Sequence, residues 1–305
     1  NKLRAYANVC RHRGARLLNG EDNCKGIRCP FHSWFYGLDG SLITAPHMDK
    51  INNFDKAQNN LISYRIEERL GFVFVCLNPM ALDIDSYLGD LESIHAPWPI
   101  ETLVSVRRQE TIVDCNWKMF IEVFNEYYHL PFIHPNTVDS IYSTPDKIDQ
   151  VTGAFATQFG TTSGTGALLE TTQENALPHM PGLSPHAAGG ARYTWVFPNI
   201  TFAANCDALW CYGAYPMGAN CCRVFDTACF PPETVALPDF PQKSLAYLNR
   251  LDAALAEDIP VLVNQQLGMT CPDARPGRFQ PDLEPNVASF AKWYGQLWQT
   301  KIDYL

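Results

Sequence analysis

The fold is decided by two segments near the start of the chain, Cys10-Arg11-His12-Arg13-Gly14-Ala15 and Cys29-Pro30-Phe31-His32. Each segment supplies one thiol and one imidazole, which are ligands for Zn²⁺ and for iron–sulfur clusters. A Cys2His2 zinc finger groups its cysteines together and places its histidines together on a helix. Here each loop supplies one of each, which favours a cluster in which one iron binds both thiolates and the other binds both imidazoles. A tetrahedral zinc site is the alternative.

Composition limits the possible functions. The chain has 305 residues, 46% hydrophobic and 18% charged, which is typical of a globular protein of about two domains. A net charge of −9 argues against nucleic acid or an anionic membrane as a partner. The best apolar run, residues 72–77, is much shorter than a membrane helix needs. Eleven is an odd number, so the cysteines cannot all pair internally, which indicates reduced thiols or metal ligands.

Turn residues and hydrophobic periodicity predict the order of elements. Residues 1–79 are typical of short strands, and the first nine already alternate like a strand, so we expect an earlier segment before residue 1. The later elements predicted are a helix at 83–93, a strand at 103–113, a helix from 116, strands at 193–197 and 208–212, and helices at 242–268 and 285–303. In the last helix, one face should carry Val287, Phe290, Tyr294, Leu297 and Trp298.

A second chemical pattern lies in residues 116–135. Glu122, Glu126 and His129 are spaced i, i+4 and i+7, which predicts that they share one face of a helix. An ideal helix would turn His134 away from His129, so we expect Pro131 to disturb the helix and bring both imidazoles to one metal. Two histidines and one carboxylate form the ligand set of non-haem Fe(II) oxygenases.

The segment from Tyr6 to Gly40 resembles the Rieske domain of ring-hydroxylating oxygenases, and residues 116–135 resemble the mononuclear-iron motif of the same family. The resemblance implies an α+β protein. An all-β Rieske [2Fe–2S] domain would occupy residues 1–80, followed by a linker at 81–102 and a helix-grip catalytic domain at 103–305, an antiparallel sheet with helices.

The resemblance also implies roles for single residues. The [2Fe–2S] cluster would be held by Cys10, His12, Cys29 and His32, and the sequence leaves open which histidine faces a neighbouring subunit. Mononuclear iron would be held by His129, His134 and Asp258. Asp258 matches an Asp that the family carries on a late helix, and Pro260 should distort that turn. Glu257 and Asp252 are the alternatives for this third ligand.

Glu126 occupies the position of the family's bridging acid, which implies a catalytic role. In the family this acid links an iron-ligating histidine, here His129, to a Rieske histidine of the neighbouring subunit. Many members have Asp there, whereas members acting on carnitine and glycine betaine have Glu, as this chain does. Val123 stands where Asn is common, and this departure leaves the iron ligands unaffected.

The substrate pocket is expected above the iron, lined by residues 136–230. Trp195, Phe202 and Trp210 are candidate substrate contacts, because aromatic faces attract a quaternary ammonium group. A flat aromatic substrate or ordinary core packing would use the same side chains. Arg192 and Arg223 are candidates for binding a substrate carboxylate. Cysteines 206, 211, 221, 222 and 229 contain no Cys-x-x-Cys pair, which favours small buried residues over a second metal site.

The resemblance implies the terminal oxygenase component of a Rieske system, which forms homotrimers when it lacks a small β subunit. It would catalyse O2-dependent hydroxylation of a small organic substrate, by mono-oxygenation or oxidative demethylation. Electrons would come from a separate NAD(P)H-dependent reductase, with or without a ferredoxin, since the sequence has no flavin or nicotinamide fingerprint. An enzyme loaded with metal, supplied by a reductase and free of disulfides is expected in the cytoplasm. Aromatic-ring cis-dihydroxylation is the nearest alternative. A Rieske electron carrier and a zinc-binding interaction protein are alternatives of other classes.

Overall fold

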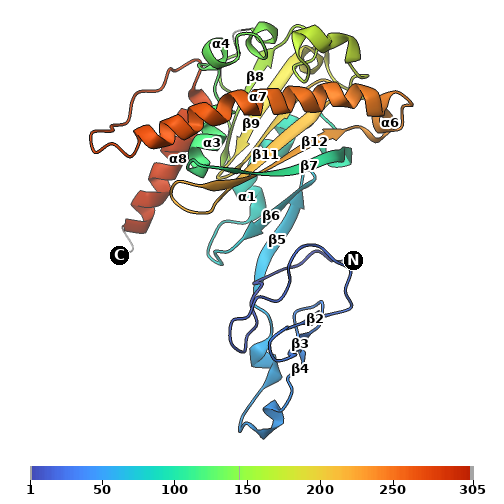
Figure 1. Cartoon of the computed structure of the whole chain (residues 1–305), viewed down its shortest axis with the longest axis vertical. Coiled ribbons are helices and arrows are strands. Elements are labelled where there is room, and N and C mark those ends of the chain that lie inside the picture. Colours follow the sequence, from blue (N-terminus) through green and yellow to red (C-terminus); the bar gives the residue numbers. More distant parts are fainter. Residues whose placement is uncertain (1, 144, 303–305) are drawn as a thin grey trace. The chain divides into compact units, whose positions relative to one another are not determined.

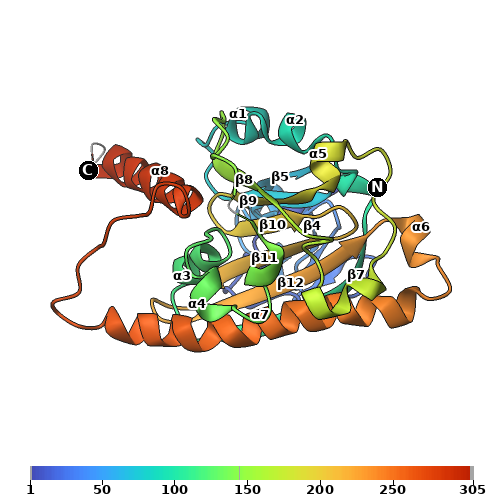
Figure 2. The same ribbon diagram turned by 90° about the horizontal axis from the view of Figure 1, so that it is seen from above.

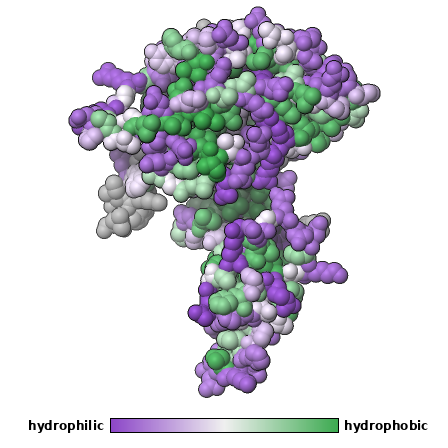
Figure 3. All heavy atoms as spheres, in the orientation of Figure 1, coloured by the Kyte–Doolittle hydropathy of each residue, from purple (hydrophilic) through white to green (hydrophobic). Residues whose placement is uncertain are grey.

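The structure is a computed structural model that describes residues 2–143 and 145–302. The chain divides into two compact units, residues 1–83 and residues 84–305 (Figure 1). In the described ranges no helix combines the length and apolarity that a membrane span requires. The face drawn in Figure 3 mixes hydrophilic and hydrophobic side chains in both units. The predicted α+β class, with an all-β unit before a unit of antiparallel sheet and helices, is confirmed.

The first unit contains two antiparallel sheets, each three-stranded in the described part of the chain, with strand orders β1-β5-β6 and β2-β3-β4. The strands are β1 (Ala5–Tyr6), β2 (Ile27–Arg28), β3 (Phe35–Tyr36), β4 (Leu42–Thr44), β5 (Ser63–Arg69) and β6 (Phe72–Cys76). Short 3-10 turns lie at Met48–Lys50 and Lys56–Asn59. The expected strand over residues 1–9 is therefore much shorter, because only Ala5–Tyr6 pairs with β5.

The second unit is built on an antiparallel sheet with strand order β7-β12-β11-β10-β9-β8. The strands β8 to β12 follow one another as neighbours, and β7 returns beside β12. The bounds are β7 (Val104–Val113), β8 (Phe155–Thr161), β9 (Gly190–Val196), β10 (Ile200–Ala204), β11 (Leu209–Pro216) and β12 (Cys222–Phe230). Every pairing is antiparallel.

Helices cover one face of this sheet. The longer helices on this face are α3 (Trp117–Val123), α7 (Phe240–Gly268) and α8 (Pro285–Ile302). Helices α3 and α8 contact β11 and β8, and α7 packs on the sheet through Tyr247 against Phe230 and Arg250 against Trp210. Figure 2 shows α7 running along one side of the sheet, with α8 beyond α3. The shorter helical segments are α1 (Ile84–Leu88), α2 (Leu91–His95), α4 (Leu130–Ile133), α5 (Pro185–Ala188), α6 (Pro232–Val235), and 3-10 turns at Ile100–Thr102, Asp139–Ile141 and Glu170–Asn175.

The long helix α7 buries one stripe of side chains at the three- and four-residue spacing of a helix face. It continues through Pro260 to Gly268. Most buried residues of the stripe are apolar, which explains why the helix packs on the sheet. Arg250 and Asp258 are charged and nevertheless only 5% and 2% exposed. Burying a charge is costly unless it is paired or used, so these two residues mark the functional part of the helix.

The helix predicted at 83–93 is interrupted, because Gly89 separates α1 from α2 with a positive φ of 52°. A Cβ at this position would meet the backbone oxygen of Thr152 at 2.1 Å, so only glycine fits. The face predicted for the last helix is buried only in its first half. Val287 and Phe290 are 4% and 2% exposed, whereas Trp298 is 55% exposed.

The prediction of one helix carrying Glu122, Glu126 and His129 is wrong. Helix α3 ends at Val123, where the Asn125 side chain donates to the Ile121 carbonyl at 2.7 Å. Pro131 does not disturb a helix, because it lies in the first turn of the separate helix α4. A first-turn proline lacks an N–H group that would have no helical partner in any case, so it starts a helix well.

Candidate metal centres and active site

In the first unit the four predicted cluster ligands come together from two tight loops. Cys10 and Cys29 are 3% and 1% exposed, and the rings of His12 and His32 lie 4.6 Å apart. Each cysteine carbonyl accepts a backbone hydrogen bond within its own loop, from Gly14 and from Ser33. Each of these hydrogen bonds closes a tight turn that contains the histidine of its loop, His12 or His32.

The protonation chemistry of these ligands fits a metal cluster. Burial opposes ionisation of Cys29, but hydrogen bonds from the backbone N–H groups of Phe31 and His32 and from Cys10 lower the pKa of its thiol. Burial, and then the nearby His32 and Arg13, lower the pKa of His12. Buried His12 Nδ1 has no hydrogen-bond partner in the described chain. Thiolate and neutral imidazole are the forms that bind metals, so the four residues fit a [2Fe–2S] cluster with mixed ligands.

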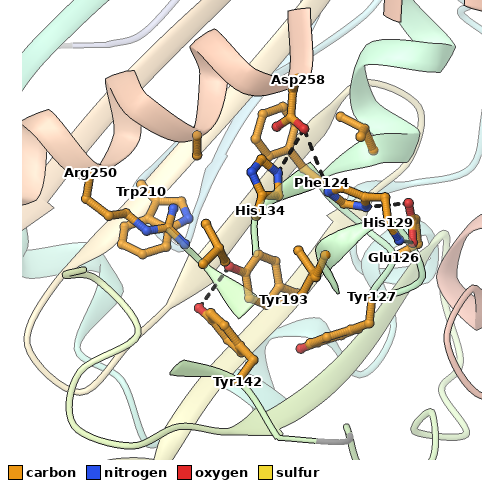
Figure 4. Close-up of a pocket in the computed structure, with 14 residues that line it drawn as sticks. Phe124, Glu126, Tyr127, His129, His134, Tyr142, Tyr193, Trp210, Arg250 and Asp258 are labelled. Carbon is orange, nitrogen blue, oxygen red and sulfur yellow. Dashed lines mark hydrogen bonds and ion pairs between the residues drawn. The ribbon is translucent and has the colours of Figure 1, made fainter. Parts of the chain in front are cut away.

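In the second unit a possible metal site is formed by His129, His134 and Asp258, whose ligand atoms all lie within 4.8 Å of one another. Asp258 Oδ1 lies 2.9 Å from His134 Nε2 and 3.7 Å from His129 Nε2 (Figure 4). His129 is the N-cap and His134 the C-cap of α4. The single turn of this helix therefore brings the two imidazoles together, although an uninterrupted helix would separate them.

Two carboxylates orient these imidazoles by contacting their Nδ1 atoms, on the side of each ring away from Asp258. His129 Nδ1 lies 2.5 Å from Glu126 Oε1, and His134 Nδ1 lies 2.6 Å from Glu257 Oε2. Each ring therefore donates its Nδ1–H to a carboxylate and directs its Nε2 toward Asp258. Metal-bound histidines are commonly oriented and made more basic in this way. Glu126 Oε2 also accepts from the backbone N–H groups of Tyr128 and His129, and Glu257 accepts from the Thr137 hydroxyl.

The acidic residues that the sequence offered as third ligand have distinct environments. Asp252 is half exposed and forms an ion pair with Arg107 at 2.9 Å. Glu257 contacts the outer nitrogen of His134. Asp258 is buried, and its Oδ1 atom accepts no well-directed hydrogen bond in the described chain. A buried carboxylate oxygen facing two imidazole nitrogens is what a metal ion would satisfy, and this donor set fits non-haem Fe(II).

A pocket opens directly beside these three side chains (Figure 4). Its remaining lining comes from the end of α3, α4 and the segments on either side of it, strands β9 and β11, and helix α7. The lining residues beyond the ligands are Val123, Phe124, Glu126, Tyr127, Leu130, Val138, Tyr142, Tyr193, Trp210, Arg250 and Ala254. The pocket is therefore mainly aromatic and aliphatic, with one guanidinium group.

Of the aromatic residues predicted to contact substrate, Trp210 lines the pocket, whereas Trp195 and Phe202 do not. Ala203 pairs with both Tyr193 and Trp210 across the sheet, which places these three side chains on one face. Phe202 points to the opposite face and packs on His95, with ring centroids 5.1 Å apart. Trp195 is on the pocket face, but Phe290 of α8 covers it at 4.1 Å. Both belong to the core.

The arginines predicted to bind a carboxylate are engaged elsewhere. Arg192 forms an ion pair with Asp149, and half-exposed Arg223 lies 3.7 Å from Glu110. The arginine in the pocket is Arg250, which sequence analysis missed. Its signal was the spacing of Arg250, Ala254 and Asp258 at intervals of four on one helix. Glu257 was considered only as a ligand, and its contact with His134 depends on the fold.

The cysteines of the sheet do not form a second metal site in the described part of the second unit, where His129, His134 and Asp258 are the one group that could hold a single metal ion. Cys206, Cys211 and Cys222 are at most 8% exposed, and all eleven cysteines are free. Burial raises the pKa of the Cys206 thiol to about 12. Such neutral thiols behave as small hydrophobic side chains.

Comparison with known protein families gives two matches. Residues 1–55 match the Rieske [2Fe-2S] domain, and residues 97–300 match the ring hydroxylating alpha subunit (catalytic domain). A catalytic-domain match of this length argues against a pure electron carrier.

The curated relatives are monooxygenases or oxygenase subunits of monooxygenases. The carnitine monooxygenase oxygenase subunit of Escherichia coli is 37% identical over 142 residues, which are 46% of this chain and 38% of that protein. The chloroplastic choline monooxygenase of Beta vulgaris is 24% identical over 311 residues, 96% of this chain and 63% of that protein. This chain therefore spans less than two thirds of the length of either relative.

Solved structures share the fold. A quaternary ammonium Rieske monooxygenase superposes with a TM-score of 0.78 at 23% identity, over 96% of this chain and 78% of the other. Naphthalene 1,2-dioxygenase from Rhodococcus sp. gives 0.74 at 21% identity, over 96% and 80%. With the two family matches, these similarities show that the chain belongs to the ring-hydroxylating oxygenase α-subunit family, with a Rieske [2Fe–2S] domain and a catalytic domain that binds mononuclear iron.

Proposed function

We propose that this protein is the terminal oxygenase component of a Rieske system and that it mono-oxygenates a quaternary amine, with oxidative demethylation where an N-methyl group is attacked. The observation that carries the proposal is the buried site of His129, His134 and Asp258, which opens onto a pocket lined by aromatic side chains. Aromatic faces attract a quaternary ammonium group. The names of the relatives, which include carnitine, glycine betaine and choline monooxygenases, support the same substrate class.

In this proposal His129, His134 and Asp258 hold iron, and Cys10, His12, Cys29 and His32 hold the [2Fe–2S] cluster. The iron supplies O2 activation and the cluster supplies single electrons. Glu126 and Glu257 hold the Nδ1 protons of the two imidazoles, so that Nε2 of each ring stays available to the metal. Phe124, Tyr193 and Trp210 form walls that exclude water and orient the substrate.

The electron path gives Glu126 its catalytic role. We propose a head-to-tail homotrimer in which Glu126, 12% exposed in its side chain, bridges His129 to His12 or His32 of a neighbouring copy. The reductant is a separate NAD(P)H-dependent reductase, with or without a ferredoxin. We also propose a cytoplasmic location, since reduced thiols and disulfide-free metal loops persist in a reducing compartment.

Oxygen consumption by the iron-loaded protein with a surrogate reductase tests the proposal. Quaternary amines and aromatic acids are supplied in turn, and products are identified by mass spectrometry. We expect O2 uptake coupled to formation of a hydroxylated or demethylated amine. A cis-diol from an aromatic substrate would instead support ring dihydroxylation. Reduction and reoxidation of the cluster without any product would reject oxygenase activity.

A further inference from the structure

Arg250 is a buried cation at the wall of the substrate pocket. The residue is 5% exposed, and its guanidinium carbon lies 4.4 Å above the Trp210 ring (Figure 4). Guanidinium groups stay protonated in proteins, so this group places a positive charge in the pocket at all working pH values. Stacking on an aromatic ring recovers less free energy than the desolvation of an arginine costs.

The charge of Arg250 has no carboxylate partner within ion-pair distance among the described residues. The buried carboxylates of this unit are engaged elsewhere. Asp226 pairs with Arg107, Asp207 accepts from Thr165 and Tyr247, and Asp258 faces the histidines.

The polar groups near the guanidinium are the phenols of Tyr193, Tyr142 and Tyr212. The Tyr142 hydroxyl donates to the Gly166 carbonyl at 3.3 Å and lies 2.9 Å from the Tyr193 hydroxyl. The Tyr193 hydroxyl therefore donates its hydrogen to Tyr142, and its lone pairs remain to accept a hydrogen bond from Arg250. These neutral oxygens can accept hydrogen bonds but cannot balance a full charge.

The position of Arg250 relative to the metal site limits the ligand. Arg250 and Asp258 are eight residues apart on α7, so their backbones are about 12 Å apart along the helix axis. Both side chains, with Ala254 between them, line the same pocket. A ligand bound to the guanidinium can therefore present its other end to the metal site if it is several bonds long.

We propose that Arg250 binds a carboxylate of the substrate, and that the enzyme acts on a quaternary amine bearing a carboxylate at its far end rather than on a purely cationic amine. This inference rests on the proposed function and narrows its substrate class. Bidentate pairing with a carboxylate is the strongest interaction open to a guanidinium and would neutralise the buried charge. The same charge repels a ligand that carries only an ammonium group.

Calorimetric titration of the iron- and cluster-loaded enzyme, under argon and without reductant, tests the inference. The probes are γ-butyrobetaine, its methyl ester, choline, and 5,5-dimethylhexanoate, in which carbon replaces the ammonium nitrogen. We expect γ-butyrobetaine to bind more tightly than its ester on the order of 30-fold, as for a buried charge pair. Equal affinity of acid and ester, or binding of neither carboxylate, would overturn the inference.

Substitutions test whether Arg250 causes the tighter binding of the acid than of its ester. Arg250→Gln should remove the preference for acid over ester, and Arg250→Lys should keep part of it. Arg107→Gln is the matched control, because Arg107 is also largely buried but pairs with Asp226 and Asp252 away from the pocket lining. Iron content and cluster absorption verify each preparation. A preference that survives in Arg250→Gln overturns the inference, and if that variant does not fold, the wild-type series and Arg250→Lys decide.

Different results would contradict the quaternary-amine substrate class and the carboxylate site at Arg250. If 5,5-dimethylhexanoate binds through Arg250 while no quaternary amine binds or is oxidised, the substrate class under the proposed function is wrong and the carboxylate site stands. If choline and γ-butyrobetaine bind equally and both are oxidised, the amine oxygenase stands and the carboxylate site is wrong.

Discussion

Glu126 Oε1 lies 2.5 Å from His129 Nδ1, on the side of the imidazole away from Asp258. The rest of the carboxylate accepts from two backbone N–H groups, so this contact is held by the chain itself. A residue in this position controls which nitrogen of His129 carries the proton. It is also a polar link from the metal site to whatever contacts Glu126 on its exposed side.

Replacing Glu126 by Gln should slow turnover about 10- to 100-fold in protein whose two metal centres have both been loaded to saturation. The amide oxygen can still accept from His129, but the negative charge is lost. The rate of cluster reoxidation in a single turnover, followed by its absorption, reports on electron transfer directly. Unchanged reoxidation and unchanged activity with a reduced partner would show that Glu126 does not bridge the centres.

His129→Ala should abolish binding of the mononuclear iron and leave the cluster absorption intact, because the two sets of ligands lie in different units. Cys29→Ser provides the reverse case, with loss of the cluster and retention of the iron. Metal analysis combined with visible spectroscopy measures both. Simultaneous loss of both metals in each variant would mean general unfolding rather than separate sites.

Glu257→Gln should weaken iron binding about 10-fold or more, since it removes the negative charge that holds the Nδ1–H of His134. Asp252→Asn on the same helix is the control, because Asp252 is half exposed and pairs with Arg107. Competition with a chelator gives the relative iron affinities. Equal affinities in the two variants would mean that Glu257 does not support His134.

Stability of the second unit should depend on pH through His95. This residue is fully buried, with Nδ1 2.7 Å from the Leu91 carbonyl and Nε2 2.7 Å from the Thr194 hydroxyl. Burial lowers the pKa of His95 to about 4 from an ordinary value of 6.5. Between these values the unfolded chain binds the extra proton, so the free energy of unfolding falls as pH falls, by up to about 3 kcal/mol.

The variant His95→Gln should be less stable than the wild type at pH 7.5, and the gap should narrow as pH falls from 6.5 to 4. Subtracting the two unfolding curves at each pH removes the effect of acid on the metal centres that both proteins share. Thermal unfolding midpoints between pH 4 and pH 7.5 measure the gap. A constant difference over this range would show that His95 is not the group responsible.

Much of the chemistry could be predicted from the sequence, because it depends on residue types at short spacings. The two Cys/His loops and the pair His129/His134 are local patterns, and the matches to known families at residues 1–55 and 97–300 agree with the family they suggested. Helix α7 was predicted within two residues of its bounds, since its apolar stripe is long and regular.

The path of the chain between α3 and α4 was mispredicted because residues can be spaced as on one helix face although the chain there is not helical. Buried Asn125 ends α3 by bonding back to Ile121, and its Oδ1 atom accepts from Thr201 of a distant strand. That partner is known only once the sheet is formed. The same limit applies to Trp195 and Phe202, whose burial follows from which face and which helix they meet.

The sequence by itself determined the types of the candidate ligands, their pairing on two loops and the order of the two units, since these follow from local chemistry and periodicity. Only the tertiary structure decided which of three acids on α7 faces both imidazoles, that Glu257 supports His134, and that Arg250 lies in the pocket with no carboxylate partner among the described residues. Helical phase and the packing of α7 on the sheet set these contacts, across more than a hundred residues of chain.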